Sequence, residues 1–369
     1  MTLPDRFITY RDAGVDTEKE EAAMSGLVQW LKQTWPLRER GAGSVQLDIG
    51  FFATVIELDR ERDLGLAMTT DSAGTKVLIA QMMEKYDTIG IDCVAMNVND
   101  LLCVGATPIS MLDYLAVEDP TPHLLKEIAK GLHEGARQAQ ITIPGGETAQ
   151  VRDILKGHKE GLGFDLAGMA IGTLSLKKII VGQKIEEGDA VIGLESHGIH
   201  SNGLTLARRV FFEGGRYTVH SRFEELDGTL GEELLRPTHI YVREVVEMLN
   251  SNLNVKALIH ITSDGLLNLT RVASETGYLI DFLPPPPPIF SLIQRIGHIS
   301  EEEMFQVYNM GIGFCIVVPE AEADQVIAIA EKHQKRAYHL GYAVRDPEKK
   351  VIIRPRGLVG KGSQFLRDR

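Results

Sequence analysis

The first half of the chain alternates short apolar runs with stretches of helical periodicity. Residues 51–58 and 64–70 are apolar-rich runs on either side of the polar segment 59–63, which predicts two paired strands around a turn. Further strands are predicted at 109–115 and 166–174, and helices at 77–84, 91–105 and 124–139. Strands that alternate with helices indicate an α/β unit, which we expect to end near residue 175.

The pattern after this boundary predicts a second unit of similar size. Strands are expected at 190–194, 255–262, 337–344 and 351–354, and helices at 203–212, 238–250, 266–274 and 321–333. Five prolines at 284–288 predict a stiff spacer before a helix near 290–295, and the tail from Gly357 is expected to be a C-terminal extension. The predicted fold class is therefore α/β and α+β, with domains at 1–175 and 176–369.

The helix predicted at 91–105 has an apolar and a polar side. On a 3.6-residue wheel its polar side holds Asp92, Asn99 and Asp100. One interpretation is a solvated polar face. We favour the other, in which Asp100 lies at the wet edge of a buried helix and binds a metal. The apolar arc opposite comprises Ile91, Val94, Ala95, Val98, Leu101 and Leu102.

Composition narrows the classes of partner. The net charge of −12 argues against a nucleic-acid partner held by a basic face. Cys93, Cys103 and Cys315 have neither disulfide-framework nor zinc-site spacing, so we expect reduced thiols and a cytoplasmic protein. Segment 1–12 lacks the apolar core of a signal peptide, and no run approaches the roughly 18 apolar residues of a membrane span. We therefore expect no membrane partner.

Four short segments place a carboxylate beside small or glycine residues, at 69–76, 87–100, 145–148 and 164–168. Glycine lets a bulky anion approach the backbone, and carboxylates need a hard cation between them and a phosphate. The pattern therefore predicts a Mg²⁺–nucleoside triphosphate site. The expected metal ligands are Asp71, Asp100 and Glu147, and Asp165 is the weakest candidate of the four segments.

Segment 70–76 follows a predicted strand and precedes a predicted helix, so its backbone N–H groups would face a phosphate. Asp71 would contact the metal, and Lys76 would neutralise triphosphate charge. The alternative is an Asp helix cap beside an exposed lysine. For 145–148 the alternative is a β-turn with an exposed Glu. The expected ATP-binding residues are Ser72, Gly74, Thr75, Lys76, Asn99, Gly145 and Gly146.

Two histidine-containing turns follow strands of the second unit. In 197–203, Ser201 or Asn202 could cap the next helix, which would leave the positive end of that helix for a second phosphate. His200 could donate to the same group or simply pack. His260 ends an apolar strand beside an acidic glycine turn, and it is either structural or a general acid/base.

These residues resemble the motifs of the phosphoribosylformylglycinamidine cyclo-ligases, also called aminoimidazole ribonucleotide synthetases. Several of the motifs are long and family-specific, and together they span most of the chain. They lie at 10–16, 70–76, 87–92, 98–101, 145–148, 198–203, 237–242, 259–260 and 304–313.

The resemblance implies an ATP-dependent closure of the imidazole ring, in which formylglycinamidine ribonucleotide and ATP give aminoimidazole ribonucleotide, ADP and phosphate. It implies a homodimer in which the N-terminal mixed sheet forms a barrel with its mate, and an α+β C-terminal domain. Mg²⁺ would be held by Asp71, Asp100 and Glu147. Asp71, Lys76 and His260 would act in catalysis, and His200, Ser201 and Asn202 would bind the substrate's ribose phosphate.

The sequence departs from the family pattern at 263–265, where a glycine triplet is replaced by Ser263-Asp264-Gly265. That variant resembles the sibling thiamine-monophosphate kinases, in which this Asp helps to bind metal, so Asp264 becomes a further metal candidate. A sibling kinase or synthetase is therefore one alternative function. A non-catalytic nucleotide-binding dimer is an alternative of another class, although such a dimer would have no need of Asp71, Lys76, Asp100 and Glu147.

Overall fold

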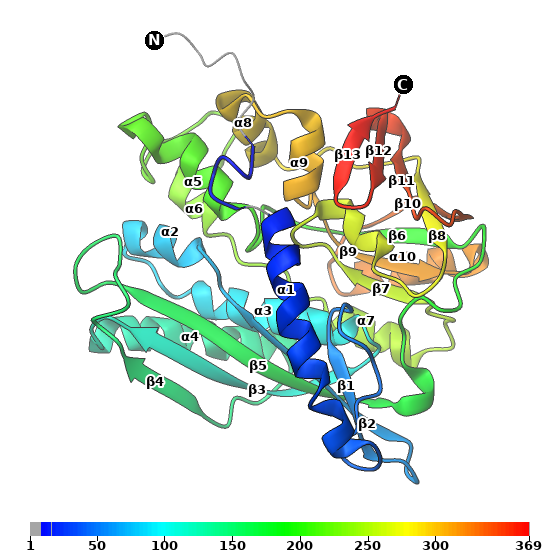
Figure 1. Ribbon diagram of the computed structural model, residues 1–369. Helices are drawn as coiled ribbons and strands as arrows, with labels where there is room; N and C mark the ends of the chain where they lie inside the picture. The colour runs from blue at the N-terminus through cyan, green and yellow to red at the C-terminus, as the bar shows by residue number, and fades with distance from the viewer. Residues whose placement is uncertain (1–8, 16, 369) are drawn as a thin grey trace.

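The first sheet is mixed and has five strands in the order β1-β2-β5-β3-β4 (Figure 1). All neighbours are antiparallel except β3 and β4, which run parallel. The computed structural model describes residues 9–15 and 17–368, so segment 1–8 and Asp16 of the opening motif lie outside the described residues. The strands are β1 (Thr54–Asp59), β2 (Leu64–Ser72), β3 (Thr107–Val117), β4 (Gly146–Gln150) and β5 (Phe164–Ser175).

The strands predicted at 51–58, 64–70, 109–115 and 166–174 are confirmed as β1, β2, β3 and β5. The interpretation of 145–148 as a turn is wrong, because the backbone of these residues continues into β4 and pairs with β3. Segment 145–148 is polar and contains two glycines, so its own sequence did not indicate a strand. The strand is imposed by pairing with a neighbour that is distant in sequence.

Helices α2 (Lys76–Met83), α3 (Ile89–Leu102) and α4 (Pro122–Ala139) confirm the three predicted helices of this unit. The interpretation of a solvated polar face on α3 is wrong, because Asp92 and Asn99 are fully buried. That side of α3 packs against the second unit, where it contacts α7 and β7. Asp100 alone keeps partial exposure, as expected for an acidic residue at the edge of a buried helix.

Helices α3 and α4 approach closely because glycines line their crossing. A Cβ atom at Gly90 would lie 2.1 Å from the backbone nitrogen of Leu132 and 2.5 Å from the carbonyl carbon of Gly131. Backbone atoms cannot move aside as a flexible side chain can, so these positions require glycine. The close crossing fixes α3, and with it Asp92, Asn99 and Asp100.

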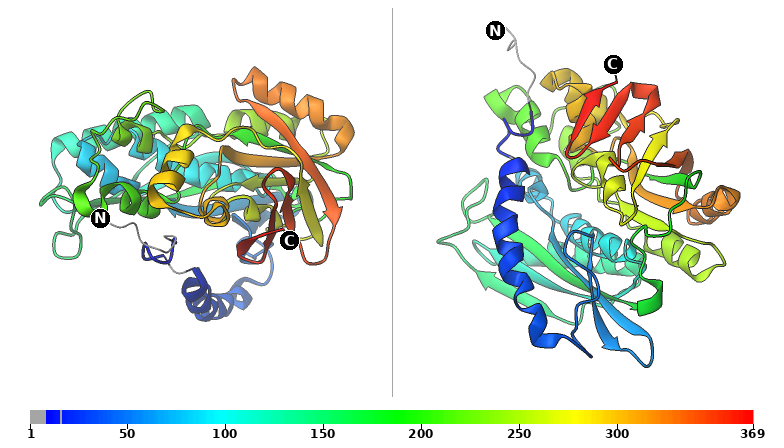
Figure 2. Two further views of the ribbon diagram at one scale, coloured as in Figure 1. Left: turned by 90° about the horizontal axis from the view of Figure 1, so that it is seen from above. Right: turned by 45° about the vertical axis from the view of Figure 1, so that its right-hand side comes forward.

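The other face of the first sheet is open. Leu112 and Tyr114 on β3 and Met169 on β5 are 43%, 47% and 41% exposed. Helix α1 (Thr17–Lys32), which the sequence pattern did not predict, crosses in front of this face, and Figure 2 shows it standing apart from the other helices. It carries further exposed apolar side chains, including Trp30 at 71%.

The second sheet is mixed and has eight strands in the order β13-β12-β11-β8-β10-β6-β9-β7. Three of its strands are fully enclosed, since every residue of β7, β8 and β9 is buried. The tail from Gly357, expected as a C-terminal extension, is a β-hairpin that extends this sheet. The strands are β6 (Ala190–Glu195), β7 (Ala257–His260), β8 (Thr276–Ile280), β9 (Ile312–Val318), β10 (Ala337–Arg345), β11 (Val351–Ile353), β12 (Leu358–Lys361) and β13 (Gln364–Arg367).

Helix α10 packs against β6, β10 and α7, while α5 packs against α8. The α-helices of this unit are α5 (Leu204–Phe212), α6 (Leu230–Leu234), α7 (Val242–Asn250), α8 (Pro288–Gly297), α9 (Glu301–Val307) and α10 (Ala323–Lys332). Short 3₁₀ helices are η1 (Trp35–Arg38), η2 (Leu176–Lys178), η3 (Glu213–Gly215), η4 (Gly265–Thr270), η5 (Glu320–Glu322) and η6 (Arg354–Arg356). No helix within 9–15 and 17–368 combines the length and apolarity needed to cross a membrane.

Two helix predictions of this unit are corrected by tertiary contacts. The helix expected from Thr238 begins only at Val242, because the backbone N–H groups of Thr238 and Tyr241 donate to Asp92 and Asn99 of α3 instead. The helix expected at 266–274 is the short 3₁₀ segment η4. There the side-chain amide of Asn268 donates to the backbone carbonyls of Ser263 and Gly265, which favours a tight turn over an α-helix.

Candidate active site

Asp71 lies near the end of β2, where Asn97 of α3 fixes its backbone. The Asn97 side chain accepts from the Asp71 N–H at 3.1 Å and donates to the Asp71 carbonyl at 3.1 Å. Asn97 is fully buried and also donates to the carbonyl of Cys93 at 2.9 Å. A buried amide with these bonds leaves the end of β2 little freedom, so the Asp71 carboxylate has a defined position.

The carboxylate of Asp100 is close enough to Asp71 to affect the pKa of Asp71. Burial, and after it the negative charge of Asp100, raises the pKa of Asp71 to about 6. The Asp71 carboxylate accepts from the Ser72 N–H at 2.7 Å, which opposes this rise only in part. Two like charges held close together favour a divalent cation between them, and carboxylate oxygens are ligands that Mg²⁺ prefers. These residues therefore fit the predicted metal.

His260 is buried behind Asp100 and has both ring nitrogens engaged. Its Nδ1 lies 2.8 Å from Oδ1 of Asp100, and its Nε2 lies 3.4 Å from the side-chain amide of Asn99. If Nδ1–H donates to the carboxylate, Nε2 accepts from the amide, and all polar atoms are satisfied. In this arrangement the buried His260 orients Asp100. Asn99 is equally enclosed, since it also contacts His239 and Tyr241.

Lys76 is the centre of a buried network between the two units. Its ammonium donates to Asp92 at 2.9 Å and to the carbonyl of Arg236 at 2.6 Å. Asp92 also accepts from Ser201 and from both the N–H and the hydroxyl of Thr238. Burial lowers the pKa of Lys76, and the charge of Asp92 opposes that change. Lys76 is 0% exposed, so in this structure it cannot contact the triphosphate for which the sequence proposed it.

The loop between β2 and α2 faces the turn at 200–203. Thr75 and Thr205 are joined by a hydroxyl–hydroxyl contact of 3.1 Å, and no side chain caps the N-terminus of α2. Ser72 accepts from the Gly74 N–H within the loop. Asn202 accepts from Ser263, which brings the 263–265 turn beside the same region. Asp264 in that turn has a positive φ of 71° at the start of η4.

Glu147 does not join Asp71 within one chain. Across the sheet Asp71 pairs with Gly168, Gly168 with Asp113, and Asp113 with Gly146, so these residues form one row. Three strand spacings, about 14 Å in total, separate Asp71 from Gly146. Glu147 pairs with Tyr114, one residue out of that row, and its side chain is therefore on the opposite face. The prediction that Asp71, Asp100 and Glu147 converge is corrected for Glu147. Gly146, which follows Gly145, is in the row of Asp71 but three strands away, while the exposed Asp165 lies on the neighbouring strand β5 with its side chain on the opposite face.

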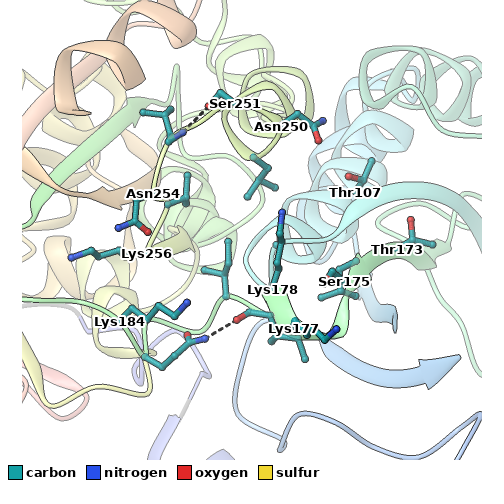
Figure 3. Close-up of a pocket in the computed structure, with 18 residues that line it drawn as sticks. Thr107, Thr173, Ser175, Lys177, Lys178, Lys184, Asn250, Ser251, Asn254 and Lys256 are labelled. Carbon is teal, nitrogen blue, oxygen red and sulfur yellow. Dashed lines mark hydrogen bonds between the residues drawn. The ribbon is translucent and has the colours of Figure 1, made fainter. Parts of the chain in front are cut away.

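A basic cavity of about 460 Å³ lies at the other end of the first sheet, between the connector after β5 and the segment after α7 (Figure 3). Its lining includes Lys177, Lys178, Lys184 and Lys256, and the described residues contribute no Asp or Glu to it. Lys256 is paired with Glu186 and Asp189. Ser175 in the lining pairs with Leu64 at the start of β2, roughly 23 Å along the strands from Asp71. This cavity is therefore separate from the acidic site.

Several residues that build the site were not predicted from the sequence. Asp92, Asn97 and Thr238 position the others through buried hydrogen bonds. A polar residue that interrupts an apolar run, as Asn97 does between Met96 and Val98, was the available signal. Nothing local to Thr238 indicated its partner on a helix 146 residues away.

Comparison with known proteins places both units in one family. The model described as AIR synthase related protein, N-terminal domain, matches 52–174, and its C-terminal counterpart matches 186–354. Relatives named phosphoribosylformylglycinamidine cyclo-ligase include that of Thermococcus kodakarensis, 46% identical over 92% of this chain and 96% of that protein. The Methanobrevibacter smithii protein of the same name is 45% identical over 87% of this chain and 90% of its own.

Solved structures share the fold at low identity. A protein of Thermus thermophilus superposes with a TM-score of 0.58 at 17% identity, over 88% of this chain and 95% of its own. Thermotoga maritima PurL complexed with ATP superposes with a TM-score of 0.53 at 14% identity, over 85% of this chain and 44% of its own. At such identity these likenesses establish the fold alone.

Proposed function

The chain belongs to the AIR synthase related family and, within it, to the phosphoribosylformylglycinamidine cyclo-ligases, and from this premise we propose that it closes the imidazole ring of aminoimidazole ribonucleotide at the expense of ATP. It is thus a ligase of purine biosynthesis. The observation that carries the nucleotide part of the proposal is the pair of carboxylates, Asp71 and Asp100, with the pKa of Asp71 raised by burial and by Asp100.

The difficulty of the reaction explains what the site must do. An amide oxygen is a poor leaving group, so ATP phosphorylates it, and an internal amidine nitrogen then displaces phosphate as the five-membered ring closes. Ring closure within one bound molecule has an effective molarity on the order of 10⁵ M or more. The protein's main task is therefore the phosphoryl step, which depends on positioning and charge neutralisation.

Each residue has a proposed part in that step. Asp71 and Asp100 would hold Mg²⁺, which neutralises triphosphate charge when bound, and Asp264 remains a further candidate ligand. The uncapped N-terminus of α2 and the loop of Ser72, Gly74 and Thr75 would receive phosphate oxygens. His260 would position Asp100 through the 2.8 Å contact, and Lys76 would position the loop through Asp92.

The open face of the first sheet supports a homodimer. Leu112, Tyr114 and Met169 are neighbours on that face, and exposed apolar patches of this kind mark interfaces. A second copy docked there would place two sheets face to face, consistent with the proposed barrel. Glu147 projects from the same face, in the row of Ser72 and not in that of Asp71, so we propose that it serves the phosphate-binding loop of the partner's site and not its own.

Mixed dimers test this assignment. Co-expression of an Asp71→Asn chain with a Glu147→Gln chain should restore about a quarter of wild-type activity, although each homodimer is nearly inactive. Half of randomly formed dimers are mixed, and in each of these one of the two sites has both carboxylates intact. Activity no higher than the average of the two homodimers would show that Glu147 acts within its own chain or not at all.

Substrate identity is tested by measuring ADP and inorganic phosphate separately. With formylglycinamidine ribonucleotide we expect equal amounts of both products. The residues 263–265 favour a thiamine-monophosphate kinase as the second candidate, and that activity would give ADP without free phosphate. No turnover with either substrate would favour the non-catalytic dimer.

The cellular location is proposed from the thiols. Cys93, Cys103 and Cys315 are free and buried. Burial raises the pKa of each thiol, which keeps it protonated and unreactive. Free thiols fit a reducing compartment, and we propose the cytoplasm.

A further inference from the structure

The basic cavity at the far end of the first sheet holds three lysines without counter-charges. Lys177, Lys178 and Lys184 line it, and within the part of the chain that the structure describes none of them forms an ion pair. Exposed lysines elsewhere are commonly paired, as Lys130 is with Glu127. The chain has a net charge of −12, so a group of lysines without an acidic partner requires an explanation.

Three carboxylates that contact residues of this lining have other partners. Glu186 and Asp189 both pair with Lys256, whose ammonium is turned away from the cavity in Figure 3. Asp63 accepts from a serine hydroxyl of β5 and from the backbone N–H of Lys177, and it forms no ion pair with the ammonium of that lysine. Like charges held near one another repel, and a bound anion would relieve the repulsion among the three lysines.

The backbone that carries the lysines is fixed by both units. The N–H of Ile180 donates to the carbonyl of Val104 in the first unit at 3.2 Å. The carbonyl of Val181 accepts from the N–H of Ala273 in the second unit at 2.7 Å. The side chain of Gln183 accepts from the Val181 N–H at 2.9 Å and closes the connector on itself. The cavity wall is therefore preformed, which lowers the entropic cost of binding a ligand.

The rest of the lining suits an organic group. The side-chain amides of Asn250 and Asn254 make no hydrogen bond within the described residues, so their donors and acceptors are available. The volume of about 460 Å³ falls in the usual range for small-molecule sites, roughly 300–1,000 Å³. Lysines, amides and an aliphatic wall together fit an anion that also has an apolar part. The aliphatic wall comprises Leu174, Ile179, Ile180, Leu249, Leu253 and Val255.

We propose that the basic cavity binds a nucleoside triphosphate without a metal ion. The three lysines would bind the phosphate oxygens, and the amides and the aliphatic wall would hold the nucleoside. In Figure 3 the side chains of Lys178 and Lys184 extend toward the space that the drawn residues enclose, so both can reach one polyphosphate. The described lining offers Mg²⁺ no carboxylate, so the lysines take over the charge neutralisation that Mg²⁺ would supply at the acidic site.

The bound nucleotide would join the two units at a second place. Thr107 and Ser175 belong to strands of the first sheet, whereas Asn250 ends α7 and Asn254 follows it in the second unit. The Lys76–Asp92 network connects the units at the end of the sheet near Asp71, and the cavity lies at the opposite end. The nucleotide would therefore fix the relative position of the units and would not take part in the chemistry.

The test is equilibrium dialysis of labelled ATP against the full-length protein in EDTA, which keeps Mg²⁺ from the acidic site. We expect one equivalent of ATP per chain, bound more weakly as the salt concentration rises. Lys178→Gln and Lys184→Gln should each weaken binding roughly tenfold, the usual effect of losing one charge-assisted hydrogen bond. Lys126→Gln, at an exposed position on α4, is the matched control and should bind as the wild type does.

Further arms separate this site from the acidic site and from simple attraction of phosphate. Asp100→Asn should retain the ATP equivalent in EDTA, and no turnover is measured, so the test is independent of the proposed function. The proposal is overturned if ATP does not bind stoichiometrically in EDTA, if both lysine variants bind it as the wild type does, or if Asp100→Asn abolishes binding. Inorganic tripolyphosphate should bind at least tenfold more weakly than ATP, and equal affinity would overturn the assignment of a nucleoside.

Discussion

Asp71→Asn is expected to lower the rate of ATP-dependent ring closure by roughly 10²–10³-fold, the usual cost of losing one principal charge stabiliser. The side chain keeps its size, and Asn97 still holds the backbone at 3.1 Å, so the site should keep its shape while it loses one carboxylate. Phosphate release at saturating ATP, and Mg²⁺ affinity by calorimetry, measure the effect. Near-normal turnover would remove the metal role assigned to Asp71.

The same substitution should stabilise the metal-free protein. The pKa of Asp71 is raised from 3.8 to about 6, so the folded state loses stability as pH rises through that interval and the carboxylate ionises. Asn cannot ionise, so the variant should gain at most about 3 kcal/mol above pH 6 and nothing below pH 4. Urea denaturation without Mg²⁺ at both pH values tests the sign. Asp324→Asn, at an exposed position in the first turn of α10, is the matched control; it should leave the rate unchanged and cost no more than about 1 kcal/mol of stability.

Lys76→Met is expected to lower the free energy of unfolding by roughly 3–5 kcal/mol, because it leaves Asp92 as an unpaired buried charge. Both side chains of this pair are 0% exposed. Ser201 and Thr238 would still donate to Asp92, but neutral donors do not replace the ammonium. Equilibrium denaturation measures the loss, and the slope with denaturant shows whether unfolding remains a single transition.

A matched control and a second variant distinguish the effect of losing the buried ion pair from the effect of losing any lysine side chain. Lys85→Met removes a lysine from an exposed pair with Asp87 and should cost less than about 1 kcal/mol. Lys76→Met combined with Asp92→Leu removes both charges and should recover part of the loss. If Lys76→Met lowered the free energy of unfolding no more than Lys85→Met does, the Lys76–Asp92 network could not be what connects the two units.

The sequence pattern was sufficient wherever an element depends on its own residues. The β1–β2 hairpin and α4 were predicted with small errors at their ends, because alternation and helical periodicity report directly which side is buried. The strand–loop–helix around Asp71 was predicted for the same reason. The motifs that resemble the family predicted the fold class and the function, since a motif is defined by which residues follow one another along the chain.

Elements whose form depends on distant partners could not be predicted in this way. Thr238 to Tyr241 continue a helical pattern, yet their N–H groups bond to α3, and α7 begins later. The polar side of α3 was indistinguishable from a solvated face until the second unit was found packed on it. Lys76 has the sequence context of a phosphate-binding lysine, and only its burial with Asp92 shows otherwise.

The amino-acid sequence by itself determined the local features of this protein: carboxylates beside glycines, a strand–turn–helix segment and histidines in turns. The tertiary structure alone decided which of them meet. Strand order β1-β2-β5-β3-β4 separates Glu147 from Asp71, and a shift of one residue in register turns its side chain to the other face. Proximity across a sheet depends on pairing between strands that are remote in sequence, and that pairing is decided by packing of the whole chain.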